Sequence, residues 1–386
     1  MMNTVLRALS MAFAMGWQIL WPLILGFALS AVVQAVVSHR EMARLLPDDR
    51  PRTMVKALAL GAASSSCSYA AVAIARSLFR KGADFTAAMA FEMASTNLVV
   101  ELAIIMLVFL GWQFTLAEFI GAPIMVGLLV VLFRRFLGRE LLEEAKAQAD
   151  RGIAGRMEGH AEMDMSITEG GSLWQRITSE QGFTAISHYF VTDWASVWMD
   201  IAGGLLISGA LAAWVPAEFW QSFFGVDHPL LARLWGPIVG PLVAVISFVC
   251  SVGNIPLAAV LWNGGISFGG VIAFILADLI ILPILNIYRK YYGWKMAGFL
   301  FVTFYAAMAG AALIVELIFD ALGLVPAQRN ARVVDAAITW DYTTWLNIAF
   351  LILAGLLVWR FFNTGGLAML RIMNKPSAMG HSHQHM

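Results

Sequence analysis

The sequence predicts an all-α, polytopic membrane protein made of two repeats of inverted topology, with one extra helix at the C-terminal end. Composition gives the first indication, because 60% of the 386 residues are hydrophobic, 13% are charged and the mean hydropathy is +0.75. The hydrophobic residues form runs long enough to cross a hydrocarbon core, which takes about 20 helical residues. Lipid offers no partner to backbone polar groups, so helices are the structure expected of these runs.

An internal repeat gives the second indication. The segments that begin at Cys67-Ser68 and Cys250-Ser251 align without a gap at an offset of 183 residues, with nine identities in 28 positions. A hydrophobic composition produces chance matches of alanine and leucine, but it does not place cysteine, serine, glycine and phenylalanine in register. We therefore predict two related halves.

Nine apolar segments are expected along the chain. Four belong to a first membrane repeat (1–138) and four to a second (186–320), and a polar connector (139–185) separates the repeats. A loop and an additional transmembrane helix (321–365) follow, and then a histidine-containing tail (366–386). The first segment has no cleavage site after its apolar run, so it is expected to remain as a helix. The segments are 11–37, 55–79, 85–111, 113–137, 188–214, 231–262, 267–288, 294–319 and 343–363.

The distribution of basic residues favours one topology. If all nine segments crossed the membrane, the 25 lysines and arginines would divide 13 to 12 between the two sides. If the cysteine-bearing segments 55–79 and 231–262 instead enter and leave on the same side, 21 of the 25 gather on one side, which the positive-inside rule favours. Both segments are rich in small, hydroxylated and helix-breaking residues, and broken backbone at membrane depth must line a cavity. The second repeat is then inverted, as in many secondary transporters. Two kinked helices that span the membrane are the alternative.

The two cysteines are the first candidate functional residues. A pair of thiols at equivalent repeat positions suits a soft, thiophilic solute. The alternative is a packing role, since cysteine behaves as a small, readily buried hydrophobe. Neighbouring hydroxyl and amide groups would line the same path or hold helices together. The expected substrate-binding residues are Cys67, Cys250, Ser66, Ser68, Ser251, Asn254 and Asn97.

Carboxylates inside the apolar segments are the second group of candidates. A charged group is costly there and normally faces the bundle interior or water. Glu92 and Asp278 lie in the repeated blocks, and Asp193 and Asp200 are seven residues apart, which places both on one helix face. We expect these four to carry protons or line the path; hydrogen bonding between helices is the alternative. Glu101 and Glu316 also lie in apolar segments.

The C-terminal tail holds three further candidates. His381, His383 and His385 are spaced as in metal-binding tracts, which indicates weak surface metal binding unless the histidines are incidental.

The cysteine blocks and the residues after them resemble a known family. Cys67-Ser68 is followed by the stretch from Phe91-Glu92 to Thr96-Asn97, and Cys250-Ser251 by Asn254 and the stretch from Asp278 to Asn286. These motifs resemble the bacterial predicted-permease family, which includes YraQ-type proteins and the ArsP-type permeases that export trivalent organic arsenicals. The similarity covers about residues 11–320 and implies a permease.

The sequence thus predicts a secondary transporter in the bacterial inner (plasma) membrane. It would export a thiophilic metalloid compound or a small organic solute through a path between the repeats. Membrane lipid and that substrate are the expected partners; zero net charge and the lack of a basic, aromatic-rich cluster argue against nucleic acid. No phosphate-binding glycine-rich loop or other cofactor motif is visible, so neither a cofactor nor enzymatic activity is expected. A membrane-embedded thiol redox enzyme using Cys67 and Cys250, and a passive channel, are the alternatives.

Overall fold

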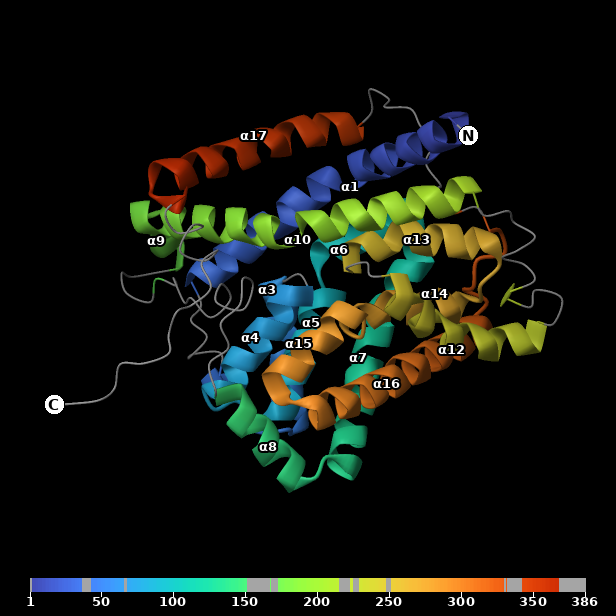
Figure 1. The fold of residues 1–386 in the computed structure, drawn as a ribbon, viewed down its shortest axis with the longest axis horizontal. Coiled ribbons are helices and arrows are strands. Elements are labelled where there is room, and N and C mark those ends of the chain that lie inside the picture. Colours follow the sequence, from blue (N-terminus) through green and yellow to red (C-terminus); the bar gives the residue numbers. More distant parts are fainter. Residues whose placement is uncertain are drawn as a thin grey trace.

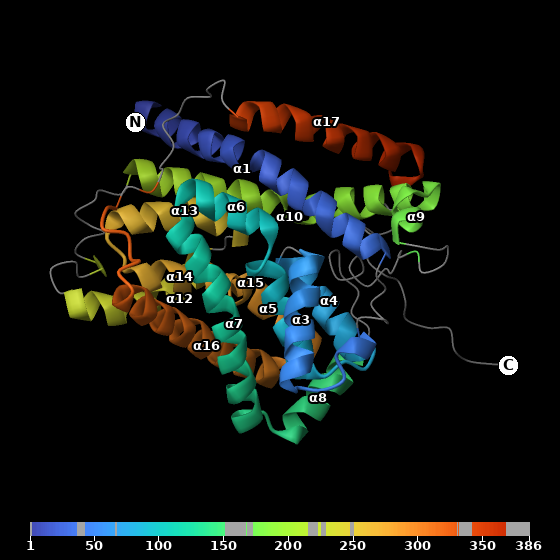
Figure 2. The same cartoon turned by 180° about the vertical axis from the view of Figure 1, so that it is seen from behind.

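A computed structural model describes residues 2–36, 43–65, 68–150, 167, 173–214, 223–224, 229–247, 251–329, 331 and 342–367, and these residues form helices without strands. Figures 1 and 2 show the long helices α1, α10 and α17 lying together beside a body made of the remaining helices. In chain order the helices are α1 (Met2–Val36), α3 (Pro51–Ser64), α4 (Ser68–Arg80), α5 (Phe85–Asn97), α6 (Val100–Phe109), α7 (Trp112–Phe136), α8 (Arg139–Asp150), α9 (Leu173–Thr178), α10 (Glu180–Trp214), α12 (Pro229–Ser247), α13 (Ser251–Gly264), α14 (Phe268–Leu276), the 3-10 helix η1 (Ala277–Leu279), α15 (Leu282–Tyr292), α16 (Trp294–Ala321) and α17 (Tyr342–Asn363).

Several helices are long and apolar enough to cross a membrane. Among the described residues, 19–36, α7, α16 and α17 pass this test singly. Two bent pairs pass it together: α5 with α6, bent by 42°, and α14–η1 with α15, bent by 40°. The prediction of an all-helical, polytopic membrane protein is therefore confirmed. The apolar segments 85–111 and 267–288 each correspond to one of these bent pairs, so each is interrupted near its middle.

The sequence repeat recurs as local backbone geometry. Gly82 and Gly265 follow α4 and α13, and both have positive φ, at 103° and 110°. Two residues later, Asp84 and Ser267 cap the next helices, and each side chain accepts a hydrogen bond from the backbone N–H three residues on. Both pairs are separated by 183 residues. The same turn and the same cap thus lead into α5 and α14.

The helices on either side of each cysteine form a pair, α3 with α4 and α12 with α13, and each pair is called a hairpin below. The backbone N–H of Asp84, after α4, donates to the carbonyl of Leu46, before α3, at 2.8 Å. In the second repeat, Gly236 near the start of α12 packs against Ser267, just after α13. In both cases, residues that precede the cysteine lie close to residues that follow the second helix of the pair.

Corresponding long helices of the two repeats run in opposite directions. Contacts along α7 pair early residues of that helix with late residues of α16, and α1 and α10 pair in the same way. The contacts that show this are Gly121–Val315 and Phe133–Phe299 for α7 and α16, and Ala12–Gly209 and Phe27–Trp194 for α1 and α10. The last helix, α17, lies along α1, where the Asn347 side chain accepts from the Trp21 backbone at 2.9 Å.

Polar contacts gather at two opposite ends of the bundle. At one end, Lys295 donates a hydrogen bond to Glu144 of α8 at 2.9 Å, and Lys146 of α8 donates to the carbonyl of Phe79 at 2.6 Å. The end of α7 also lies there. The other end holds the ion pair between Arg233 and Asp320, at 2.7 Å. Lys146 and Lys295 thus lie at one end of the bundle and Arg233 at the other.

Candidate substrate site at the helix breaks

The broken helices place free backbone groups in the middle of the bundle. α5 ends at Asn97 and α6 begins at Val100, so carbonyls of the last turn of α5 lack helical partners. Side chains at this end add hydrogen bonds to carbonyls one turn earlier: Ser95 donates to the Glu92 carbonyl at 2.8 Å, and Asn97 donates to the Met93 carbonyl at 3.0 Å. The polar residues before the break thus bond to the backbone of their own helix.

Asp278 is the centre of the site. It lies in η1, at the corresponding break of the second repeat, and is fully buried. The Ser68 hydroxyl, at the start of α4, donates to its Oδ2 at 2.8 Å across 210 residues of chain. Thr96 and Asn97 of α5 face the same carboxylate. The site therefore joins a hairpin and a helix break of the first repeat to the break of the second.

Glu92 makes a second contact between the repeats. The Tyr288 hydroxyl of α15 donates to Glu92 Oε1, and both side chains are fully buried. Glu92 Oε2 has no hydrogen-bond partner, and the charges of Glu92 and Asp278 interact. Two acidic groups are thus held close together with unused hydrogen-bonding capacity.

Within the described part of the chain, Glu118, Asn254 and Tyr292 are buried side chains without any hydrogen-bond partner. Glu118 of α7 has both oxygens unpaired, and Asn254 of α13 has both amide atoms unpaired. Glu118 interacts electrostatically with Asp278, and α13 packs against η1. Buried polar groups without partners are rare in folded proteins and call for an explanation such as a ligand. Sequence reasoning missed Glu118, although a carboxylate inside the apolar segment 113–137 was a usable signal.

The structure brings together some predicted site residues and separates others. Ser68, Asn97, Glu92 and Asp278 meet at the breaks, and Asn254 lies on the adjoining helix α13. Asp193 lies elsewhere, between α10 and α1, where it accepts from Gln34 at 3.1 Å. Ser251 and Asp200 belong to α13 and α10, but their side chains lie outside the described part of the structure, as do Cys67, Cys250, Ser66, His381, His383 and His385.

The two remaining acidic groups of the apolar segments have local structural roles. Glu316 accepts from the Ser267 hydroxyl at 3.0 Å and from the Gly269 backbone at 3.2 Å, at the start of α14. Glu101 accepts from Ser65, at the tip of the first hairpin. Hydrogen bonding between elements, the alternative considered for these carboxylates, accounts for both.

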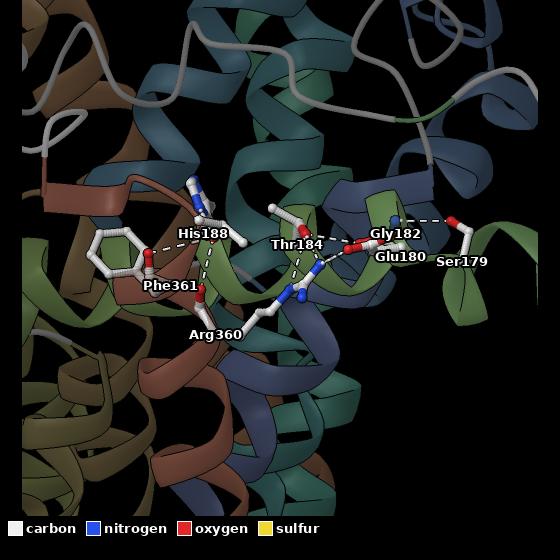
Figure 3. Close-up of polar contacts among 8 residues, drawn as sticks. Ser179, Glu180, Gly182, Thr184, His188, Arg360 and Phe361 are labelled. Carbon is white, nitrogen blue, oxygen red and sulfur yellow. Dashed lines mark hydrogen bonds and ion pairs between the residues drawn. The ribbon is translucent and has the colours of Figure 1, made fainter.

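Two hollows lie away from the helix breaks. One of about 700 Å³ is lined by the α6–α7 turn, Trp262 and the segment 326–328. Another of about 500 Å³ lies between α10 and α17; Figure 3 shows Arg360 there reaching Glu180 at 3.1 Å and Thr184 at 2.9 Å. Within the described residues, no group of three histidine, cysteine or acidic side chains is arranged to hold a metal ion.

Spanning helices, two bent pairs and a buried polar centre define a polytopic membrane protein of the transport class. The chain belongs to the predicted permease family, whose model matches residues 4–317. It is 62% identical over 348 residues to "Putative permease Rv2963" of Mycobacterium tuberculosis (strain ATCC 25618 / H37Rv), covering 90% of this chain and 86% of that protein. No solved structure matches the chain.

Proposed function

We propose that this permease is a secondary transporter whose substrate path runs between the two repeats, through the site centred on Asp278. The hydrogen bond from Ser68 to Asp278, at 2.8 Å, carries the proposal. It joins the N-terminal end of α4 in one repeat to a helix break in the other, deep in the bundle. Discontinuous helices that meet near the middle of the membrane are where secondary transporters bind substrates and coupling ions.

The geometry supports an inverted pair of repeats. Each repeat has a hairpin that leaves the bundle on the side where it entered, and the equivalent helices α7 and α16 are antiparallel. The end that holds α8 is the basic one, so we assign it to the cytoplasm and place the protein in the bacterial inner membrane. The hairpins then re-enter from opposite sides, α3–α4 from the cytoplasm and α12–α13 from outside.

We propose export of a thiophilic metalloid compound or a small organic solute. Cys67 directly precedes Ser68 in the chain, and Cys250 directly precedes Ser251, so each thiol adjoins the first residue of a half-helix. Thiolates are preferred ligands of soft metals and metalloids. Glu92 and Asp278 would carry the protons that drive the exchange, since buried carboxylates are the usual proton relays of membrane transporters.

The experiment is an accumulation assay in cells that lack their own exporters. Methyl- and phenylarsenicals in the trivalent state, arsenite, antimonite and copper are offered to cells with the protein, without it, and with single variants. Cys67→Ser, Cys250→Ser and Asp278→Asn should each restore the accumulation that the native protein lowers. Asp320→Asn, which changes a half-exposed carboxylate at the bundle end, serves as the control and should export normally.

Two outcomes would separate the alternatives. Unchanged accumulation of every compound would exclude a soft substrate. Activity that persists in membrane vesicles after the proton gradient is collapsed would contradict a proton-driven transporter and favour a channel or a thiol enzyme.

A further inference from the structure

The hollow of about 700 Å³ opens at the end of the bundle opposite α8. Its lining includes Leu107, Gly111, Gln113, Trp262 and Tyr342. α7 begins at this hollow and ends beside α8, so the hollow lies at the opposite end of that helix. In the topology proposed above, this end faces the outside of the cell.

Three aromatic rings pack together beside the hollow. Trp262, which lines it, meets Phe114 edge-on with ring centroids 5.1 Å apart, and Phe114 lies 4.7 Å from Phe268. None of the three is more than 3% exposed. We call these three side chains together the aromatic ring. Phe114 comes from the start of α7, Trp262 from the end of α13 and Phe268 from the start of α14.

The charged side chain of Arg329 holds this aromatic ring together. Arg329 lies over the Trp262 indole at 4.3 Å, and its guanidinium donates to the carbonyls of Trp262 at 2.8 Å and Ile266 at 2.7 Å. A cation over an indole face and two charge-assisted hydrogen bonds hold the end of α13 in place. The ring therefore stays closed in this conformation.

Glu118 lies on the inner side of the aromatic ring. It is one turn after Phe114 on the buried face of α7. Phe114 contacts Phe268, while Gly121 lies against Ile272 and Leu276, so Glu118 is placed along α14 between the ring and the break at η1. Both its oxygens are buried without a hydrogen-bond partner. Glu118 lies near enough to Asp278, the centre of the site, for the two carboxyl groups to influence each other electrostatically.

We propose that the outward half of the path runs from the hollow through the aromatic ring to Glu118 and on to Asp278, with the ring as its outer gate. Glu118 is the residue that binds protons arriving from outside once the aromatic ring opens. This deepens the proposed function, because it assigns the outer gate and a proton-binding residue to the same path. This role requires a carboxyl group without a hydrogen-bond partner next to a closed barrier, because the carboxyl group can then exchange a proton only when water reaches it.

Accessibility from outside tests the gate without any knowledge of the substrate. Glu118→Cys is placed in a Cys67→Ser/Cys250→Ser background, and intact cells are treated with a cationic, membrane-impermeant methanethiosulfonate. Gln113→Cys, in the hollow, should react rapidly. Glu118→Cys should react slowly, and added Trp262→Ala or Phe114→Ala should speed it roughly tenfold, as expected when one aromatic pair is removed from a closed–open equilibrium.

Phe133→Ala is the matched control, because Phe133 is also a buried phenylalanine of α7 but lies near the α8 end. It should leave the Glu118→Cys reaction rate unchanged. The proposal is overturned if Phe133→Ala accelerates the reaction as much as the ring variants, or if neither ring variant changes it while Gln113→Cys reacts. Reaction only from the cytoplasmic side, in inverted vesicles, would overturn it as well. Each of these results is independent of whether arsenicals are exported.

Discussion

The hydrogen bond between Ser68 and Asp278 predicts a measurable coupling between the repeats. Ser68→Ala removes the only described side-chain donor to Asp278 Oδ2 that comes from the first hairpin, and Asp278 Oδ1 is already unpaired. Double-mutant cycles in membrane proteins give interhelical hydrogen bonds about 0.6 kcal/mol on average and about 1.7 kcal/mol at most. Both groups are fully buried, so we expect a coupling free energy between Ser68→Ala and Asp278→Ala of about 0.6–1.7 kcal/mol.

The assay is reversible unfolding of the purified protein in mixed micelles, for the two single variants and the double variant. Ser187→Ala is the control, since Ser187 is also a buried serine but donates to the Leu357 carbonyl on α17. Its cycle with Asp278→Ala should give additive effects within about 0.5 kcal/mol. A Ser68–Asp278 coupling no larger than that of the control would refute the contact, and with it the argument that the hairpin and the second break form one site.

Two other predictions concern packing and pH. A Cβ added at Gly61 would lie 2.5 Å from the Phe91 carbonyl oxygen, so Gly61→Ala should destabilise the protein by about 1–3 kcal/mol. At Gly127 an added Cβ meets nothing within 4 Å, so Gly127→Ala should be neutral or stabilising. Equal melting temperatures of the two variants would contradict this prediction. Partial burial raises the pKa of the Asp84 carboxyl, at the turn before α5 and outside the spanning segments, above 3.8. The folded state then binds a proton more readily than the unfolded state, so native stability relative to Asp84→Asn should rise as the pH falls through the folded pKa and level off below 3.8; thermal unfolding from pH 7 to pH 3 would show a flat or opposite trend if this is wrong.

Much of the helical architecture follows from local sequence. Apolar segments of the required length predict helices because lipid leaves backbone groups no other partner. The repeat offset of 183 residues correctly paired the turns at Gly82 and Gly265 and the caps at Asp84 and Ser267, because turns and caps are determined by a few neighbouring residues. The exact positions of the breaks inside 85–111 and 267–288 were not predicted, although Ser95, Thr96 and Asn97 precede the first break and Asp278 and Pro283 flank the second.

From the sequence, the site could be predicted only as a set of ionisable residues that are energetically costly inside a membrane. Asp278, Glu92, Glu118 and Glu316 all lie in apolar segments. The repeated blocks distinguish Glu92 and Asp278, but nothing in the sequence separates Glu118 from Glu316. The tertiary structure distinguishes these residues by their contacts. Glu316 accepts from Ser267 and Gly269 next to the cap of α14, whereas Glu118 has no partner and lies between an aromatic seal and Asp278.

The sequence by itself determined that this chain is a helical membrane protein with polar groups in its core. Only the tertiary structure decided which of those groups meet. Hydrophobic length and capping act between residues a few positions apart, so the chain encodes them locally. The contact of Ser68 with Asp278 joins residues 210 positions apart, and it exists only because two hairpins and two broken helices pack against one another.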